Sequence, residues 1–229
     1  DCNGAVDDGV VAPEAACETE NADGLCTGDW SCGGASAWSC SAATPAAETC
    51  DYHDNEWGRP VQASAALFER VSLEAFQSGL SWLIILRKRD NFRTAFDGFD
   101  VERVARYSER DVDRLMADAG IVRNRSKIDA TISNARIVVE LADDGVDLGE
   151  LLWSFAPQDR VTRARPADLS QVAAVTPEST AMAKELKRRG LRFVGPTTAY
   201  ALMQATGMVD DHVADCWAPR LSGRPSESP

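Results

Sequence analysis

The sequence lacks any run of about eighteen apolar residues, the length that an apolar helix needs to span a bilayer. Close to its first residue, Asp1, it also lacks the charged stretch and the following apolar stretch of a secretory signal. These absences argue against an integral membrane protein and against a secreted one. They predict a chain that acts in the cytoplasm, with no membrane partner.

Strand-like alternation of apolar and polar residues is absent as well. From Leu67 to about Thr206, apolar residues instead recur every three or four positions, which is typical of amphipathic helices. Asp100, Ser108 and Thr176 stand where helix N-caps are expected, and a proline follows the last of them. The sequence therefore predicts an all-α body.

Lysine and arginine are absent from residues 1–39, which are rich in alanine, glycine, aspartate and serine and show no periodicity. Such a composition is typical of a segment that cannot bury a core. We therefore expect a disordered or irregular extension over 1–39, a helical domain over 40–218 and a flexible tail over 219–229.

The formal net charge of −12 is unevenly distributed along the chain. Residues 1–60 carry twelve acids and one base, Arg59, which leaves 24 acids and 23 bases for the remainder. The body is therefore nearly neutral, so a basic face for nucleic acid remains compatible with the composition.

Six of the seven cysteines lie in the first fifty residues, and the odd total argues against a closed disulfide framework. In a reducing compartment this crowding indicates metal ligands or incidental thiols. The cysteines are Cys2, Cys17, Cys26, Cys32, Cys40, Cys50 and Cys216.

A carboxylate interrupts the first apolar helical stripe. Leu67 and Val71 are spaced as on one helix face, and Glu74 continues that face. One interpretation is an acid at the edge of the stripe that reaches water or caps a neighbouring turn. The other is an acid that faces a ligand in an apolar pocket, with Trp82 as a flat wall beside it.

A basic helix end runs into a glycine-containing turn between Lys184 and Ala199. The unpaired amides at the start of the next helix, with cations beside them, suit a phosphate group. The alternative is an ordinary helix-turn-helix whose basic residues are only solvated. The candidate contacts to the DNA backbone are Lys187, Arg188, Arg189, Gly195, Thr197 and Thr198.

The two histidines lie near opposite ends of the body, at His53 and His212. Cys216 follows His212 by four residues, so on a helix both would share one face and suit a tetrahedral zinc ion. His53 and one of the front cysteines could complete the set. The alternative is that each histidine is an ordinary hydrogen-bonded polar residue.

Five segments in unbroken order resemble the 3-methyladenine DNA glycosylase I family over about 52–217. The resemblance implies a helix-hairpin-helix fold and hydrolysis of the bond between deoxyribose and alkylated adenine in double-stranded DNA. It also implies a monomer. The matching segments are Tyr52 to Gly58, Leu73 to Trp82, Gly120 to Ile128, Lys187 to Thr198, and Asp211-His212 with Cys216.

The same resemblance implies one structural zinc ion that joins the two ends of the domain through Cys, His, His and Cys. His53, His212 and Cys216 occupy three of those positions, and Cys40, thirteen residues ahead of His53, occupies the fourth. Cys50 competes with Cys40 for that place. The sequence departs from the family here, because Ala42 stands where the family has tryptophan.

The resemblance assigns the base pocket to Tyr52, Trp57, Glu74 and Trp82, with Glu74 as the catalytic residue that also recognises the base. Asp210, near the place where related glycosylases carry a catalytic aspartate, is expected to be a surface acid. Two other functions stay open. One is a non-catalytic, zinc-containing module that binds damaged DNA, and the other is a glycosylase with an altered substrate range.

Overall fold

The computed structural model describes the backbone of residues 17–21, 24–28, 30–32, 38–40 and 47–221, and the side chains of residues 51–221. The chain divides into two compact units, Asp1–Asn55 and Glu56–Pro229. Among the helices of the described residues, none is both long enough and apolar enough to cross a bilayer. The predicted flexible tail falls largely on residues 222–229, outside the described part.

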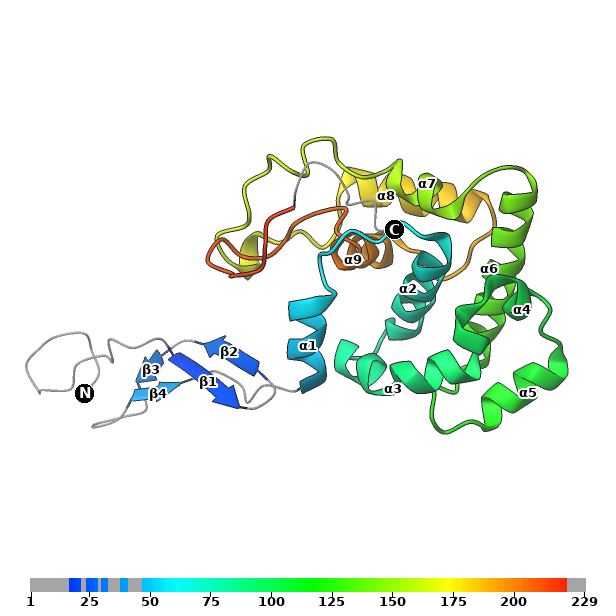
Figure 1. Cartoon of the computed structure of the whole chain (residues 1–229), viewed down its shortest axis with the longest axis horizontal. Coiled ribbons are helices and arrows are strands. Elements are labelled where there is room, and N and C mark those ends of the chain that lie inside the picture. Colours follow the sequence, from blue (N-terminus) through cyan, green and yellow to red (C-terminus); the bar gives the residue numbers. More distant parts are fainter. Residues whose placement is uncertain (1–16, 22–23, 29, 33–37, 41–46, 222–229) are drawn as a thin grey trace, which may run out of the picture. The chain divides into compact units, whose positions relative to one another are not determined.

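The first unit contains two short antiparallel hairpins and one helix (Figure 1). Strand β1 (Cys17–Asn21) pairs with β2 (Gly24–Gly28), β3 (Trp30–Cys32) pairs with β4 (Trp38–Cys40), and α1 spans Ala47–Asn55. The sequence predicts no strand there. Strands of three to five residues need no long apolar alternation, so periodicity gave no signal.

In the second unit, every regular element of the described residues is helical, which confirms the all-α expectation for the body (Figure 1). The long helices α2, α3 and α6 are joined by short helices and turns. The elements are α2 (Ser64–Gln77), α3 (Trp82–Ala95), η1 (Asp97–Phe99), α4 (Val101–Ala105), α5 (Glu109–Ala117), α6 (Arg125–Asp143), α7 (Leu148–Trp153), η2 (Leu169–Gln171), α8 (Pro177–Arg188) and α9 (Pro196–Ala205).

The predicted caps begin these helices. The Asp100 side chain accepts a hydrogen bond from the Arg103 amide at the start of α4. Thr176 forms a reciprocal capping box with Ser179 at the start of α8, and Ser108 opens α5 in the same way. Because each cap satisfies amides that have no partner inside the helix, these starts were readable from sequence.

Helix α2 lies at the centre of the second unit and packs against α3, α6, α7 and α9. Its apolar face joins a cluster of phenylalanines in which Phe76 lies 4.6 Å from Phe92 and 5.9 Å from Phe96, centroid to centroid. All three rings are fully buried. Since α2 also carries Glu74, its rigid packing fixes the position of that carboxylate.

The start of α2 touches α7 closely at one glycine. A Cβ atom on Gly149 would lie 2.1 Å from the backbone oxygen of Gln62 and 2.9 Å from the Asp147 carboxylate. The Gly149 amide also donates a hydrogen bond to the Ser64 hydroxyl at 3.1 Å, which holds the two segments at this short distance. Only glycine therefore permits this approach.

We predict that Gly149→Ala lowers the free energy of unfolding by about 2–4 kcal/mol, because backbone rather than a flexible side chain must move. Urea denaturation measures the change. The matched control is Glu150→Ala at the next, exposed position, expected to stay within about 0.5 kcal/mol of wild type. Equal stability of the two variants would contradict the prediction.

Candidate active site

Glu74 lies in the last turn of α2 and is 5% exposed. Burial raises its pKa to about 7, against a smaller opposing effect of the Arg70 charge. The interpretation of Glu74 as an edge acid that reaches water is therefore wrong. A carboxyl group that changes charge near neutral pH inside an apolar helix face is the kind of group found at functional sites.

Trp82 begins α3, directly after the tight connection that leaves α2. The connection turns at Gly79, whose φ is 81°, and the Leu80 amide donates to the Gln77 carbonyl at 2.7 Å. The Gln77 side chain returns a hydrogen bond to the Leu80 carbonyl at 3.0 Å. Glu74 and Trp82 thus flank one braced turn, and the half-buried indole packs against the core.

Lys127, in the first turn of α6, holds this turn from the other side. Its Nζ donates to the carbonyls of Phe76 at 2.8 Å and Ser78 at 2.6 Å, backbone acceptors at the end of α2, where a helix leaves its last carbonyls without an intrahelical partner. Burial lowers the pKa of Lys127. The sequence assigned no role to this residue.

Asn134, two turns further along α6, binds the backbone of the hairpin between α8 and α9. Its side-chain amide donates to the Arg192 carbonyl at 3.0 Å, and its side-chain oxygen accepts from the Arg192 amide at 2.8 Å. The side chain is 2% exposed. With Lys127 and Thr131, Asn134 forms a buried polar stripe on α6. Polar residues that recur at helical spacing inside an apolar helix are the sequence signal that could have indicated these roles.

The hairpin itself has the backbone of a tight turn. Gly190 has a φ of 97° and Phe193 one of 57°, both in the left-handed region. Leu191 and Val194 are buried and anchor the hairpin in the core. Gly195 is the N-cap of α9 and Pro196, which has no N–H, is its first residue, so the amides of Thr197 and Thr198 are the ones without an intrahelical acceptor.

The predicted basic contacts surround this helix start. Lys187, Arg188 and Thr197 are exposed, whereas Arg189 and Thr198 are half-buried. Glu185 accepts hydrogen bonds at 2.7 Å from both Arg188 and Arg189, which lower its pKa to about 2. These two guanidinium groups are thus pre-oriented by an acid of their own helix.

The other predicted pocket residues are divided between the two units. Tyr52 lies on α1 of the first unit and is 6% exposed. Trp57 lies in the second unit, with its ring centroid 4.6 Å from that of His212 in an edge arrangement. The adjacent Gly58, whose φ is 74°, leaves no room for a Cβ, which would lie 2.5 Å from His212. Trp57 and Gly58 therefore pack on a predicted zinc ligand.

The four predicted zinc ligands are also divided. Cys40 ends β4 and His53 lies on α1, where its Nδ1 is 2.8 Å from the Asp54 carboxylate. His212 and Cys216 lie in the second unit, and the expectation that they share a helix face is wrong. Helix α9 ends at Ala205, and the segment after Gly207 is a series of turns.

Asp210 binds this non-helical segment from inside, and its expected place on the surface is wrong, because its side chain is 9% exposed. Its carboxylate accepts from Arg165 Nε at 2.9 Å and lies 2.8 Å from His212 Nδ1. Burial acts to raise the pKa of Asp210, but these two hydrogen bonds outweigh it and hold the pKa below its ordinary value. Arg165 also donates to the backbone of Cys216 at 3.0 Å and Ala218 at 2.8 Å.

Asp211 fixes the same segment to α9. It accepts from the Tyr200 hydroxyl at 2.7 Å and from the Gln204 amide at 2.8 Å. Burial, followed by this hydrogen bond, raises the pKa of Tyr200. Neither Asp210 nor Asp211 is therefore placed as a solvent-facing acid.

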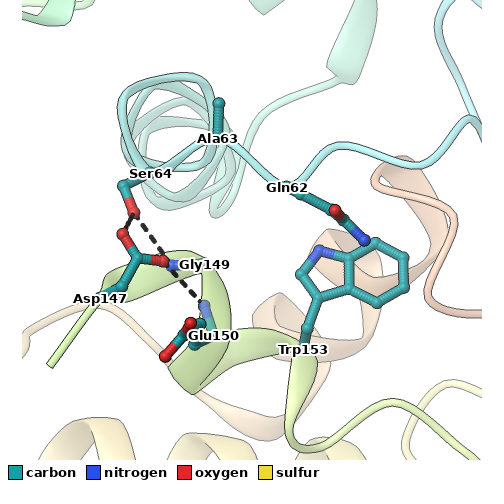
Figure 2. Close-up of a pocket in the computed structure, with 7 residues that line it drawn as sticks. All are labelled: Gln62, Ala63, Ser64, Asp147, Gly149, Glu150 and Trp153. Carbon is teal, nitrogen blue, oxygen red and sulfur yellow. Dashed lines mark hydrogen bonds between the residues drawn. The ribbon is translucent and has the colours of Figure 1, made fainter. Parts of the chain in front are cut away.

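A cavity of about 400 Å³ opens between the start of α2 and α7, away from these groups (Figure 2). Its polar side chains are engaged with each other and with backbone: Ser64 donates to Asp147 at 2.5 Å, and Trp153 Nε1 donates to the Val61 carbonyl at 2.6 Å. None of the predicted site residues lines it. It is therefore separate from the predicted base pocket.

A helical domain with a buried carboxylate and a basic hairpin between two helices is the arrangement that the sequence led us to expect of a DNA glycosylase. Comparison with known families is more specific. The chain belongs to the methyladenine glycosylase family, whose model matches residues 42–219.

Individual relatives agree with this assignment. The chain is 48% identical to DNA-3-methyladenine glycosylase 1 of Escherichia coli (strain K12) over 166 residues, 72% of this chain and 88% of that protein. It is 33% identical to the solved 3-methyladenine DNA glycosylase I of Staphylococcus aureus, covering 78% and 95% of the two chains with a TM-score of 0.74. A variant of such an enzyme in complex with 3-methyladenine is 32% identical, covers 78% and 96%, and has a TM-score of 0.73.

The raised pKa of Glu74 makes a prediction for stability. Because the folded-state pKa of about 7 exceeds the ordinary 4.5, ionisation destabilises the fold, and the loss of stability develops between these pH values and is complete above them. We predict that Glu74→Gln is more stable than wild type by about 1–3 kcal/mol at pH 8 and gains little near pH 4.5. Urea denaturation at both pH values measures this, and a gain that does not depend on pH would contradict it.

Proposed function

We propose that this protein is a base-excision repair enzyme that hydrolyses the N-glycosidic bond of 3-methyladenine in alkylated double-stranded DNA. The observation that carries the proposal is Glu74, a carboxyl group buried in α2 beside the turn to Trp82, with a pKa near neutrality. Membership of the methyladenine glycosylase family and the names of the relatives support the same activity.

The reaction requires that the damaged nucleotide leave the helix, since a base inside a duplex is out of reach. Flipping costs a few kcal/mol of stacking, and least for a damaged base. Methylation at N3 makes the adenine ring cationic and weakens its bond to deoxyribose. The leaving group is therefore already good, and the protein needs to recognise the base more than to activate it.

Recognition of this cation is the task of the pocket residues. Glu74, when ionised, accepts hydrogen bonds from the base and attracts its positive charge in a medium of low polarity. Trp82 stacks on the flipped ring, with Tyr52 and Trp57 lining the remainder of the pocket. Neutral adenine gains less from the carboxylate, so the pocket discriminates by charge.

The hairpin between α8 and α9 supplies the grip on DNA. Lys187, Arg188 and Arg189 neutralise phosphates, while the amides that follow Gly195, with Thr197 and Thr198, donate to phosphate oxygens. These contacts read no sequence, which suits an enzyme whose target occurs anywhere in DNA. The domain acts as a monomer in this proposal.

A structural zinc ion held by Cys40, His53, His212 and Cys216 completes the proposal. Two thiolates and two imidazoles are a donor set that zinc prefers. The contact of His212 Nδ1 with the Asp210 carboxylate fits this role, because zinc-binding histidines commonly present their other nitrogen to a carboxylate. The ion would hold chain ends together and take no part in bond cleavage.

We predict that Glu74→Ala lowers release of 3-methyladenine from methylated DNA by about 100-fold or more, because the charged partner of the base is lost. Chromatography of the freed bases measures this. Glu150→Ala, which removes an exposed acid of α7, is the matched control and keeps wild-type release. Wild-type release by Glu74→Ala would reject the assignment, and binding of methylated DNA without release by the wild-type chain would favour a non-catalytic damage-binding module.

We predict one zinc ion per chain in the purified full-length protein and its loss in the double variant His212→Ala, Cys216→Ala. Metal analysis by mass spectrometry measures the occupancy. Cys40→Ser and Cys50→Ser, compared side by side, identify the fourth ligand, and we expect Cys40→Ser to lose the metal. Full zinc occupancy in the double variant would rule out this site.

A further inference from the structure

A buried arginine lies one helical turn before Glu74 on α2. Arg70 is 7% exposed and Glu74 is 5% exposed, and residues four apart on a helix are neighbours on one face. A guanidinium group in this position is too buried to hold DNA phosphates, and burying it is costly without partners. We therefore expect a role of Arg70 within α2, next to Glu74, rather than in DNA binding.

An ion network holds this guanidinium from the side opposite the helix. Arg70 Nη2 donates to the Glu56 carboxylate, which also accepts two hydrogen bonds from Arg89 at 2.7 and 2.8 Å. Arg89 in turn donates to Glu69 at 2.8 Å. Glu56 thus holds the Arg70 guanidinium in place, and its carboxylate also accepts hydrogen bonds from Arg89.

Several charged or titratable groups on the helices packed against α2 have other partners or are exposed. Arg89 of α3 is bound to Glu56 and Glu69, and Lys127 of α6 donates to two backbone carbonyls. Tyr200 of α9 donates to Asp211, and Asp97 of η1 accepts from Tyr107. Glu150 of α7 is exposed. Arg70 is the group whose charge opposes the effect of burial on Glu74.

We propose that Arg70, anchored by Glu56, is a specificity-determining residue that favours the ionised form of Glu74 against the effect of burial, so that the pocket selects a cationic base. This inference rests on the proposed function. A guanidinium four residues away stabilises the carboxylate through space, while its anchoring to Glu56 limits how far it neutralises the attraction that Glu74 exerts on the ligand. Arg70 acts through Glu74 and does not need to touch the base.

The test is the pH profile of kcat/KM for 3-methyladenine release. The methylated nucleoside is cationic throughout the assay range because its N3 carries a methyl group, so the profile reports the enzyme. Wild-type activity is expected to rise with pH through a midpoint near 7. In Arg70→Met the midpoint should move up by roughly one pH unit, with about a tenfold loss at pH 6.5 and near recovery at pH 9. Arg70→Lys, which keeps the charge, should restore the wild-type midpoint.

Two further variants separate this role from a structural one. Glu56→Gln removes the negative charge beside Arg70 and should move the midpoint down, opposite to Arg70→Met, even if the methionine variant fails to fold. Arg93→Met removes a more exposed arginine that binds Glu69 and should leave the midpoint unchanged. A uniform loss of activity at every pH in Arg70→Met, or an unmoved midpoint in Glu56→Gln, would overturn the proposal.

The outcome also distinguishes this inference from the proposed function. If Glu74→Ala retains wild-type release, the assignment of the pocket itself fails. If Glu74→Ala loses release while Arg70→Met and Glu56→Gln keep the wild-type midpoint, the pocket assignment stands and the role of Arg70 alone is rejected.

Discussion

The burial of one negative charge is the constraint on which the rest of this structure depends. Glu74 interrupts the apolar face of α2, and placing a carboxylate there is unfavourable unless the surroundings compensate. The compensation is partial, because the pKa of about 7 leaves the group divided between charged and neutral forms at physiological pH. In the proposed function, a cationic ligand would complete the compensation, and the free-energy cost of burying Glu74 would become a source of selectivity for the damaged base.

Helix α6 connects the end of α2, which carries Glu74, to the hairpin between α8 and α9. Lys127 holds the backbone at the end of α2, and Asn134 holds the backbone of Arg192, so one rigid helix positions both elements. Both contacts are made to backbone atoms, which fixes the path of the chain rather than a single side chain. A flipped base must enter the pocket while its neighbouring phosphates stay at the hairpin, and a shared support keeps that separation constant.

The sequence predicted the features that arise from local rules, and missed those that arise from tertiary contacts. Helix caps such as Thr176 and the stripe that contains Glu74 follow from spacing alone. The roles of Lys127 and Asn134 could not be read, because their partners are carbonyls and amides 49 to 58 residues away. His212 and Cys216 have helical spacing but lie in turns, since Asp210 and Arg165 bind this segment in a non-helical course.

In the proposed role, Arg70 tunes the pocket without itself touching the ligand. A cation inside the pocket would repel the methylated base, whereas a guanidinium bound to Glu56, one helical turn from Glu74, favours the ionised acid. Its anchoring to Glu56, itself bound by Arg89, disperses the positive charge over a larger network. Discrimination by charge therefore depends on where the compensating charge lies as much as on the acid itself, which is why residues outside the pocket belong to the specificity of the reaction.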